Sequence, residues 1–164
     1  MNTILHSFAY TLDFLRDLLA DVSPADMVAQ PPGTANHPAW LVGHLTFSCQ
    51  ELGGVVGLTP WLPKIWALQF GPGSTPVADV KAYEPKTLLL DRLRDAQTRI
   101  ATAVAALDDE ALDSIFPEVT LRNVFPTVRH ALTQVLLGHT SYHVGQLAVW
   151  RKAAGLPTLG RSFQ

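Results

Sequence analysis

Residues 128–155, VRHALTQVLLGHTSYHVGQLAVWRKAAG, contain the pattern that decides the fold. Positions three or four residues apart along this stretch form one stripe: Val128, Leu132, Val135, His139, His143, Gln146 and Trp150. Such spacing places side chains on one face of an α-helix. Pro126 suits the first turn of a helix, and Gly155 suits its end. The stretch therefore predicts a last helix of about thirty residues that carries two histidines on its inner face.

Two other segments show helical spacing of apolar residues. Near the N-terminus these residues are Ile4, Phe8, Leu12, Leu15 and Leu19, and Ser23-Pro24 follows them. Between Pro85 and Leu107 they are Leu89, Leu93, Ala96, Ile100, Ala103 and Leu107. Both patterns are typical of amphipathic helices that bury one face.

A further helix is predicted to begin near His37. Residues 30–36 contain Pro31, Pro32 and Gly33, which cannot continue a helix, whereas Asn36 and Pro38 suit the start of one. One face of this helix would carry Leu41, His44, Leu45, Ser48 and Leu52. Regular structure is expected to weaken at Gly53-Gly54.

The connections between these helices are irregular. Residues 53–85 are rich in Gly and Pro and contain Trp61 and Trp66, so we expect a long connection that covers one end of the helices, with a short helix near 63–70. Residues 108–124 form a second irregular segment, and no run alternates as a strand would. The sequence predicts an all-α fold, a four-helix bundle with a long irregular connection between helices two and three, formed as a single domain over residues 1–164.

Composition narrows the choice of partners and compartment. Hydrophobic residues make up 48% of the chain and the net charge is -2, so a folded protein is expected and neither nucleic acid nor an anionic membrane surface is favoured. No run reaches the ~20 apolar residues of a membrane span, and the N-terminus lacks the basic start of a signal peptide. Cys49 is the only cysteine, which fits a reducing cytoplasm.

The histidine pair His139 and His143 has the spacing of a metal half-site. Side chains at i and i+4 are roughly 5 to 6 Å apart, close enough for both imidazoles to reach one ion. His44 on the second helix could supply a third nitrogen, leaving positions open to polarise water or a thiol. The alternative is that these are core histidines. Buried imidazoles without hydrogen-bond partners would cost about 1 to 3 kcal/mol each, which favours ligands.

The other three histidines and the cysteine do not share the positions of these three. His6, His37 and His130 lie off the helical stripes or at a helix start, and we do not expect them to be ligands. Cys49 lies about 140° round the helix from His44, which favours a simple buried thiol.

Two further residues lie on the faces of the expected ligands. Gln146, one turn beyond His143, could orient that imidazole or make an ordinary polar contact. Glu51, seven residues beyond His44, could be a general base or a solvated charge.

Two phrases, NHPAWLVGHL at 36–45 and HTSYHVGQLAVWRKAAGLP at 139–157, resemble the DinB/YfiT-like superfamily of metalloenzymes. The resemblance spans essentially the whole chain. It implies a four-helix bundle in which His44, His139 and His143 bind a divalent metal, commonly nickel or zinc. Relatives include metal-dependent transferases and isomerases that use low-molecular-weight thiols, and many form homodimers.

These observations lead to one main hypothesis of function and two alternatives. The main one is a metal-dependent enzyme acting on a small molecule, by thiol transfer or by hydrolysis. The alternatives are a noncatalytic metal-binding or stress-response module, and a metal-free helical interaction domain. No basic cluster for a carboxylate-bearing thiol is evident, although Lys64, Arg151 or Arg161 could approach the site.

Overall fold

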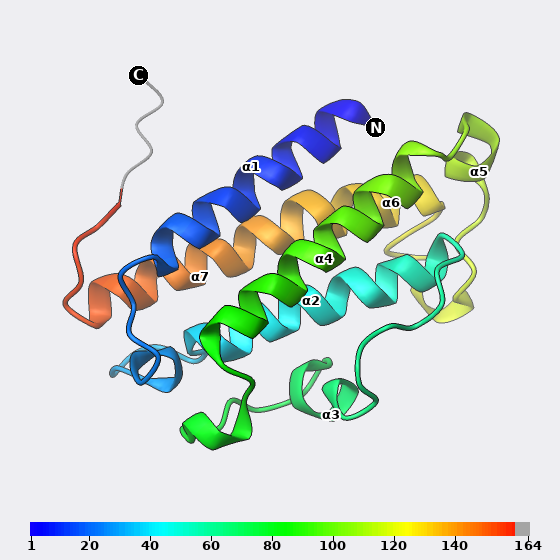
Figure 1. Cartoon of the computed structure of the whole chain (residues 1–164). Coiled ribbons are helices and arrows are strands. Elements are labelled where there is room, and N and C mark those ends of the chain that lie inside the picture. The colour runs from blue at the N-terminus through cyan, green and yellow to red at the C-terminus, as the bar shows by residue number, and fades with distance from the viewer. Residues whose placement is uncertain (160–164) are drawn as a thin grey trace.

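The computed structural model describes residues 1–159, and within them the chain is all-helical, as predicted (Figure 1). The longest helices are α1 (Asn2–Leu19), α2 (Pro38–Val55) and α4 (Lys86–Ala105). Short α-helices that a count of four omits occur as well, in the connections that follow α2 and α4. None of the described helices is both long and apolar enough to cross a membrane.

The expected long last helix is present but is not uniform. It consists of α6 (Val128–Thr133), a π-helical segment at Gln134–His139 and α7 (Thr140–Ala153), which follow one another directly. A π-helix has more residues per turn than an α-helix. Leu136 is accordingly buried where the regular pattern pointed to Val135, which is only half-buried. The segment ends at His139, so it rotates the face that carries His139 and His143 relative to the buried face of α6.

The long helices pack side by side around one core (Figure 1). Helix α1 lies against α4 and α7, and α2 lies against α4 and α7. The expected faces of α1 and α4 are buried, with three small differences: Ile4 is half-buried, Val104 takes the place expected for Ala103, and Leu107 is half-buried beyond the end of α4. The amphipathic patterns thus predicted which side of each helix faces the core.

Two buried or half-buried cations join the ends of these helices. The Arg151 side chain, 1% exposed, pairs with Asp21 and donates to the Leu18 carbonyl. The Lys86 ammonium donates to the carbonyls of Leu19 and Val22. The last carbonyls of a helix have no partners within it, so these bonds satisfy the C-terminal end of α1.

The connection after α2 runs along the side of α2. It contains α3 (Trp66–Phe70), near the expected position, and a 3₁₀ turn at Val80–Ala82. Gln50 on α2 accepts hydrogen bonds from the backbone of Trp61 and Leu62 in this connection. We expected this connection to cover one end of the helices. It lies along their side instead, because α3 packs against α2.

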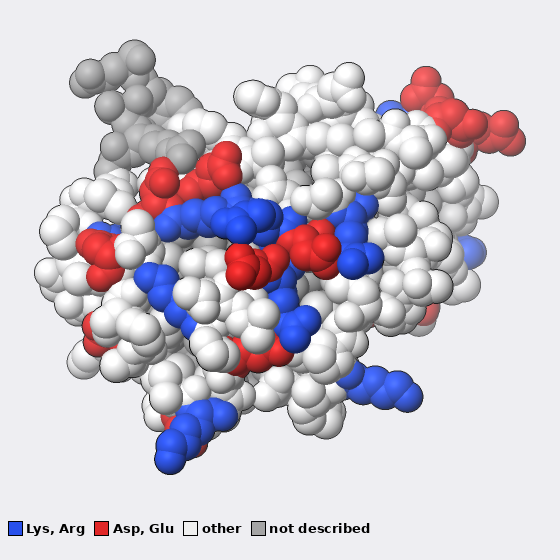
Figure 2. Space-filling model, in the orientation of Figure 1, with Lys and Arg blue, Asp and Glu red and all other residues white. Residues whose placement is uncertain are grey.

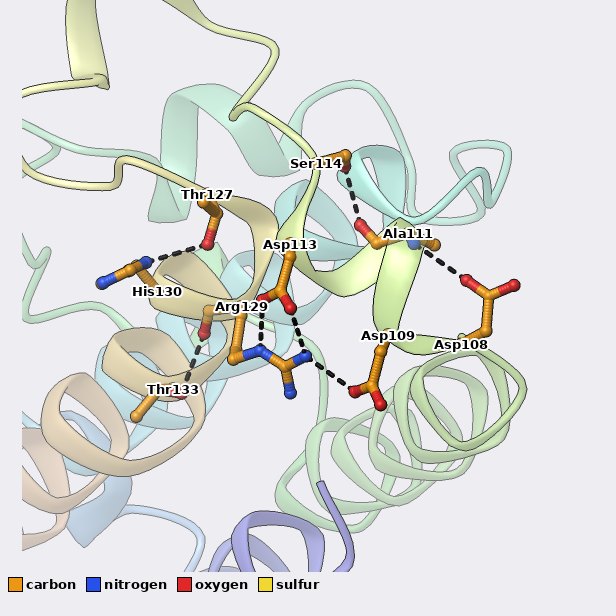
Figure 3. A network of polar contacts seen from close by, with 9 residues as sticks. All are labelled: Asp108, Asp109, Ala111, Asp113, Ser114, Thr127, Arg129, His130 and Thr133. Carbon is orange, nitrogen blue, oxygen red and sulfur yellow. Dashed lines mark hydrogen bonds and ion pairs between the residues drawn. The ribbon is translucent and has the colours of Figure 1, made fainter.

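The segment before the last helix is more ordered than expected. It contains α5 (Asp109–Asp113), which the Asp108 side chain caps at its N-terminus, and a 3₁₀ turn at Val119–Leu121. Arg129 on α6 forms ion pairs with Asp109 and Asp113, which joins α6 to α5 (Figure 3). Asp108, a good N-terminal cap, was the sequence signal from which α5 could have been predicted.

Candidate metal centre

His44 projects from α2 into the interior and is held there on two sides. Its side chain is 7% exposed, and its Nδ1 atom lies 2.6 Å from the Phe70 carbonyl oxygen. The Trp40 ring stacks on the imidazole with centroids 4.6 Å apart. A carbonyl only accepts hydrogen bonds, so Nδ1 carries the proton and Nε2 presents a lone pair.

Gly43 permits the close approach of α3 that brings the Phe70 carbonyl to His44. A Cβ atom at residue 43 would lie only 2.1 Å from the Phe70 ring. The Phe70 side chain is itself buried and packs against Trp66. The absence of a side chain at Gly43 is therefore a condition for the contact that fixes the orientation of His44.

His143 on α7 is fixed by a chain of side-chain hydrogen bonds. Its Nδ1 atom lies 2.9 Å from Oε1 of Gln146, and the same oxygen accepts a hydrogen bond from Nδ2 of Asn36 at 3.1 Å. With the Gln146 oxygen placed between these two partners, His143 donates from Nδ1. Its Nε2 atom therefore presents a lone pair, as in His44.

The three histidines that the sequence singled out converge. Nε2 of His139 lies 3.0 Å from Nε2 of His44 and 3.1 Å from Nε2 of His143. One ligand atom from each side chain lies within 4.8 Å of the others. The neutral His139 ring can donate from Nε2 to only one of the two lone pairs that face it.

This arrangement fits a cation better than it fits a set of core histidines. The lone pairs on Nε2 of His44 and of His143 both face Nε2 of His139, so without a cation at least one of them has no donor among the three rings. Two nitrogens bound to one tetrahedral zinc ion at about 2.0 to 2.1 Å are roughly 3.3 Å apart, close to the spacing found here. The three side chains could therefore hold a metal ion after small outward shifts.

Burial keeps these imidazoles neutral. Desolvation lowers the pKa of His44 and of His143, and it lowers the pKa of His139 to about 4, with a further contribution from the charges of its two neighbours. A neutral imidazole is the form that binds a metal. The site is thus in its ligating form at neutral pH.

These pKa shifts predict that the metal-free protein loses stability in acid. Below pH 6.5, the ordinary pKa of histidine, the unfolded chain binds protons that folded His139 does not accept until about pH 4. The free energy of unfolding should be largest above pH 6.5 and fall by about 2 kcal/mol as the pH approaches 4. Urea unfolding in the presence of a chelator measures this slope, which should be smaller in His139→Ala. An equal slope in that variant would contradict this assignment.

Cys49 and the remaining histidines lie elsewhere in the fold. The other three histidines are outside the cluster: His37 caps α2, His130 bonds to Thr127 (Figure 3), and His6 is exposed on α1. Cys49 is buried, and burial raises the pKa of its thiol to about 12, so it stays protonated.

Lys64 and Arg151, the two described basic residues that could have approached a thiol cofactor, both lie away from the site. Arg151 is buried against Asp21, and Lys64 is exposed in the connection after α2. Arg161 lies outside the described residues.

Gln146 orients His143, one of the two roles that the sequence left open for it, whereas the other groups that orient the imidazoles were missed. The Phe70 carbonyl lies 26 residues from His44, and Asn36 lies 110 residues from Gln146, so no helical spacing connects either pair. Sequence reasoning also missed a cavity of about 450 Å³ that His44 and His139 line. One wall of this cavity comes from residues 116–125, which had been expected only to connect helices.

Comparison with known proteins agrees with these observations. The sequence profile described as the DinB superfamily matches residues 8–147. The matched range includes α2, the π-helical segment and all three converging histidines. No curated protein matches the chain in sequence. The chain belongs to the DinB superfamily.

Proposed function

We propose that this protein is a divalent-metal-dependent enzyme that acts on a small molecule, with His44, His139 and His143 as its metal ligands. The observation that carries the proposal is the convergence of three Nε2 atoms, two of which have their lone pairs directed by fixed partners on Nδ1. Zinc and nickel both suit three imidazoles.

The ligand set favours catalysis over a purely structural ion. Structural zinc sites are normally closed by four protein ligands, whereas catalytic sites keep a position open. Among residues 1–159, the cluster contains three side chains and no fourth His, Cys, Asp or Glu. When bound, a divalent ion would supply Lewis-acid polarisation of an oxygen or sulfur group. The cavity beside His44 and His139 gives a small molecule access to that position.

The protein's own residues would orient and enclose the reactants. The Phe70 carbonyl and Gln146 hold the rings of His44 and His143, and groups of this kind are typically worth 10- to 100-fold in metal affinity. Glu51 lies about 10 Å from His44 along the helix axis and lines the same cavity as His44 and His139. This position supports a role for Glu51 in substrate binding.

Thiol transfer and hydrolysis can be separated by two model reactions. Metal-loaded protein would be assayed with 2-mercaptoethanol, a thiol without a carboxylate, and 1-chloro-2,4-dinitrobenzene, whose reaction forms a thioether and releases chloride and a proton. p-Nitrophenyl acetate would report hydrolysis. We expect metal-dependent turnover in one of these assays, lost in His44→Ala and reduced in Gln146→Ala. The exposed residue His6 provides a matched control, because His6→Ala should keep full turnover.

Full metal loading without turnover in either assay would contradict the proposed enzyme and favour a noncatalytic metal-binding module. In that case, removal of the metal should lower the melting temperature and change nothing else.

We also propose that the four long helical segments act as one four-helix bundle within a single domain. The support is the continuous core that α1, α2, α4 and α7 share. A cytoplasmic homodimer is the corresponding proposal for assembly and location, based on the family resemblance. Sedimentation of the purified protein tests the dimer.

A further inference from the structure

The cavity beside the histidines has apolar walls and an acidic rim. Aromatic side chains from α2 and from residues 116–125 contribute to its walls: Phe47, Phe116 and Phe125. Its volume of about 450 Å³ is in the range of small-molecule sites. Among the described residues, the lining includes two acidic side chains, Glu51 and Glu118, and no Lys or Arg. Such a lining favours an apolar ligand that carries a positive charge.

The wall formed by residues 116–125 is fixed by hydrogen bonds at both ends. The Phe116 amide donates to the Pro126 carbonyl, and the Val128 amide donates to the Ser114 carbonyl. Arg122 donates from Nε to the Phe116 carbonyl at 2.7 Å, which closes the loop on itself. The cavity is therefore formed before a ligand arrives, so binding does not have to order this wall.

Glu118 is held as a carboxylate in this wall. The backbone amide and the hydroxyl of Thr120 both donate to Oε1 of Glu118, and these bonds lower the pKa of its carboxyl group. Glu51 is exposed on α2, seven residues from His44. Seven residues span about 10 Å along a helix, so Glu51 is attached to α2 about two turns beyond His44.

We propose that the cavity binds an elongated, apolar small molecule with an ammonium group, whose reactive end meets the histidines and whose charged end meets Glu51 and Glu118. This inference rests on the proposed function, because that function places the reactive end at His44 and His139. It also disfavours thiols that carry a carboxylate, because such a thiol would meet two carboxylates and, among the described residues, no Lys or Arg in this cavity.

Three ligands with the same chain and different head groups test the charge preference. n-Octylamine, octan-1-ol and octanoate would be titrated into metal-loaded and metal-free protein by calorimetry at low salt. The head-group preference is taken from the metal-free protein, because a bound ion could itself coordinate the amine or the carboxylate. We expect one molecule of n-octylamine to bind about five-fold more tightly than octan-1-ol, and octanoate to bind most weakly. Glu51→Gln and Glu118→Gln should each remove part of the preference for the amine and leave octan-1-ol unchanged. Glu110→Gln, on exposed α5, is the matched control and should change nothing.

A charge reversal keeps the test independent of the two glutamates. Leu121 lines the cavity and is 41% exposed, so Leu121→Arg should fold and shift the preference from the amine towards octanoate. Equal affinities of the wild type for n-octylamine and octanoate would overturn the inference. So would an unchanged preference for n-octylamine in both Glu51→Gln and Glu118→Gln. Metal content is measured in the same samples. Metal loading without an amine preference overturns this inference alone, whereas an amine preference in a protein that never binds metal overturns the proposed function.

Discussion

Replacement of His139 by alanine is expected to lower the affinity for a divalent ion by at least about a hundred-fold. His139 is the middle member of the cluster, since its Nε2 atom lies within about 3 Å of both other Nε2 atoms. Structural zinc sites with four ligands bind with about 10 to 16 kcal/mol, so one ligand accounts for roughly 3 kcal/mol. Competition with a chromogenic chelator measures the change for zinc and for nickel.

The same helix offers a matched control for this variant. His130 lies nine residues before His139, is exposed and bonds to Thr127, outside the cluster (Figure 3). His130→Ala should bind metal as the wild type does. Equal affinities of wild type, His130→Ala and His139→Ala would show that the ion binds elsewhere.

Gly43→Ala should destabilise the fold by about 3 kcal/mol and weaken metal binding at the same time. The new Cβ atom would overlap the buried Phe70 ring, and overpacking of this kind typically costs about 1 to 3 kcal/mol. Movement of Phe70 would also withdraw the carbonyl that orients His44. Urea unfolding and the chelator competition together measure both effects.

Gly54 serves as the control for Gly43, because it lies on the same helix and a Cβ atom there would meet nothing within 4 Å. Gly54→Ala should be neutral or more stable by up to about 1 kcal/mol, since alanine favours helices. The double variant Gly43→Ala/Phe70→Leu should recover part of the lost stability. Equal free energies of unfolding for Gly43→Ala and Gly54→Ala would contradict the close approach of α3 to α2 at Gly43.

The helices were predictable because burial of one face leaves a periodic signal. Phe8, Leu12 and Leu15 of α1, and Leu89 and Leu93 of α4, are buried as their spacing indicated. The π-helical segment was not predictable in this way, because a period of 3.6 residues was assumed throughout.

The metal centre was predictable only in part, for a related reason. The helical positions of His44, His139 and His143 indicated that they could meet. Helical spacing also indicated Gln146 as a partner of His143. The other partners could not be predicted, because the Phe70 carbonyl is a backbone group and Asn36 lies 110 residues from Gln146. Contacts of that kind depend on how the connections pack, and they leave no local pattern in the sequence.

The most direct test of the account is the metal content of untagged wild-type protein. Elemental analysis should find close to one divalent ion per chain, zinc or nickel, either as purified or after incubation with the metal and removal of the excess. Absence of bound metal after incubation with zinc and with nickel would contradict the assignment of His44, His139 and His143 as ligands, and the proposed enzyme with it.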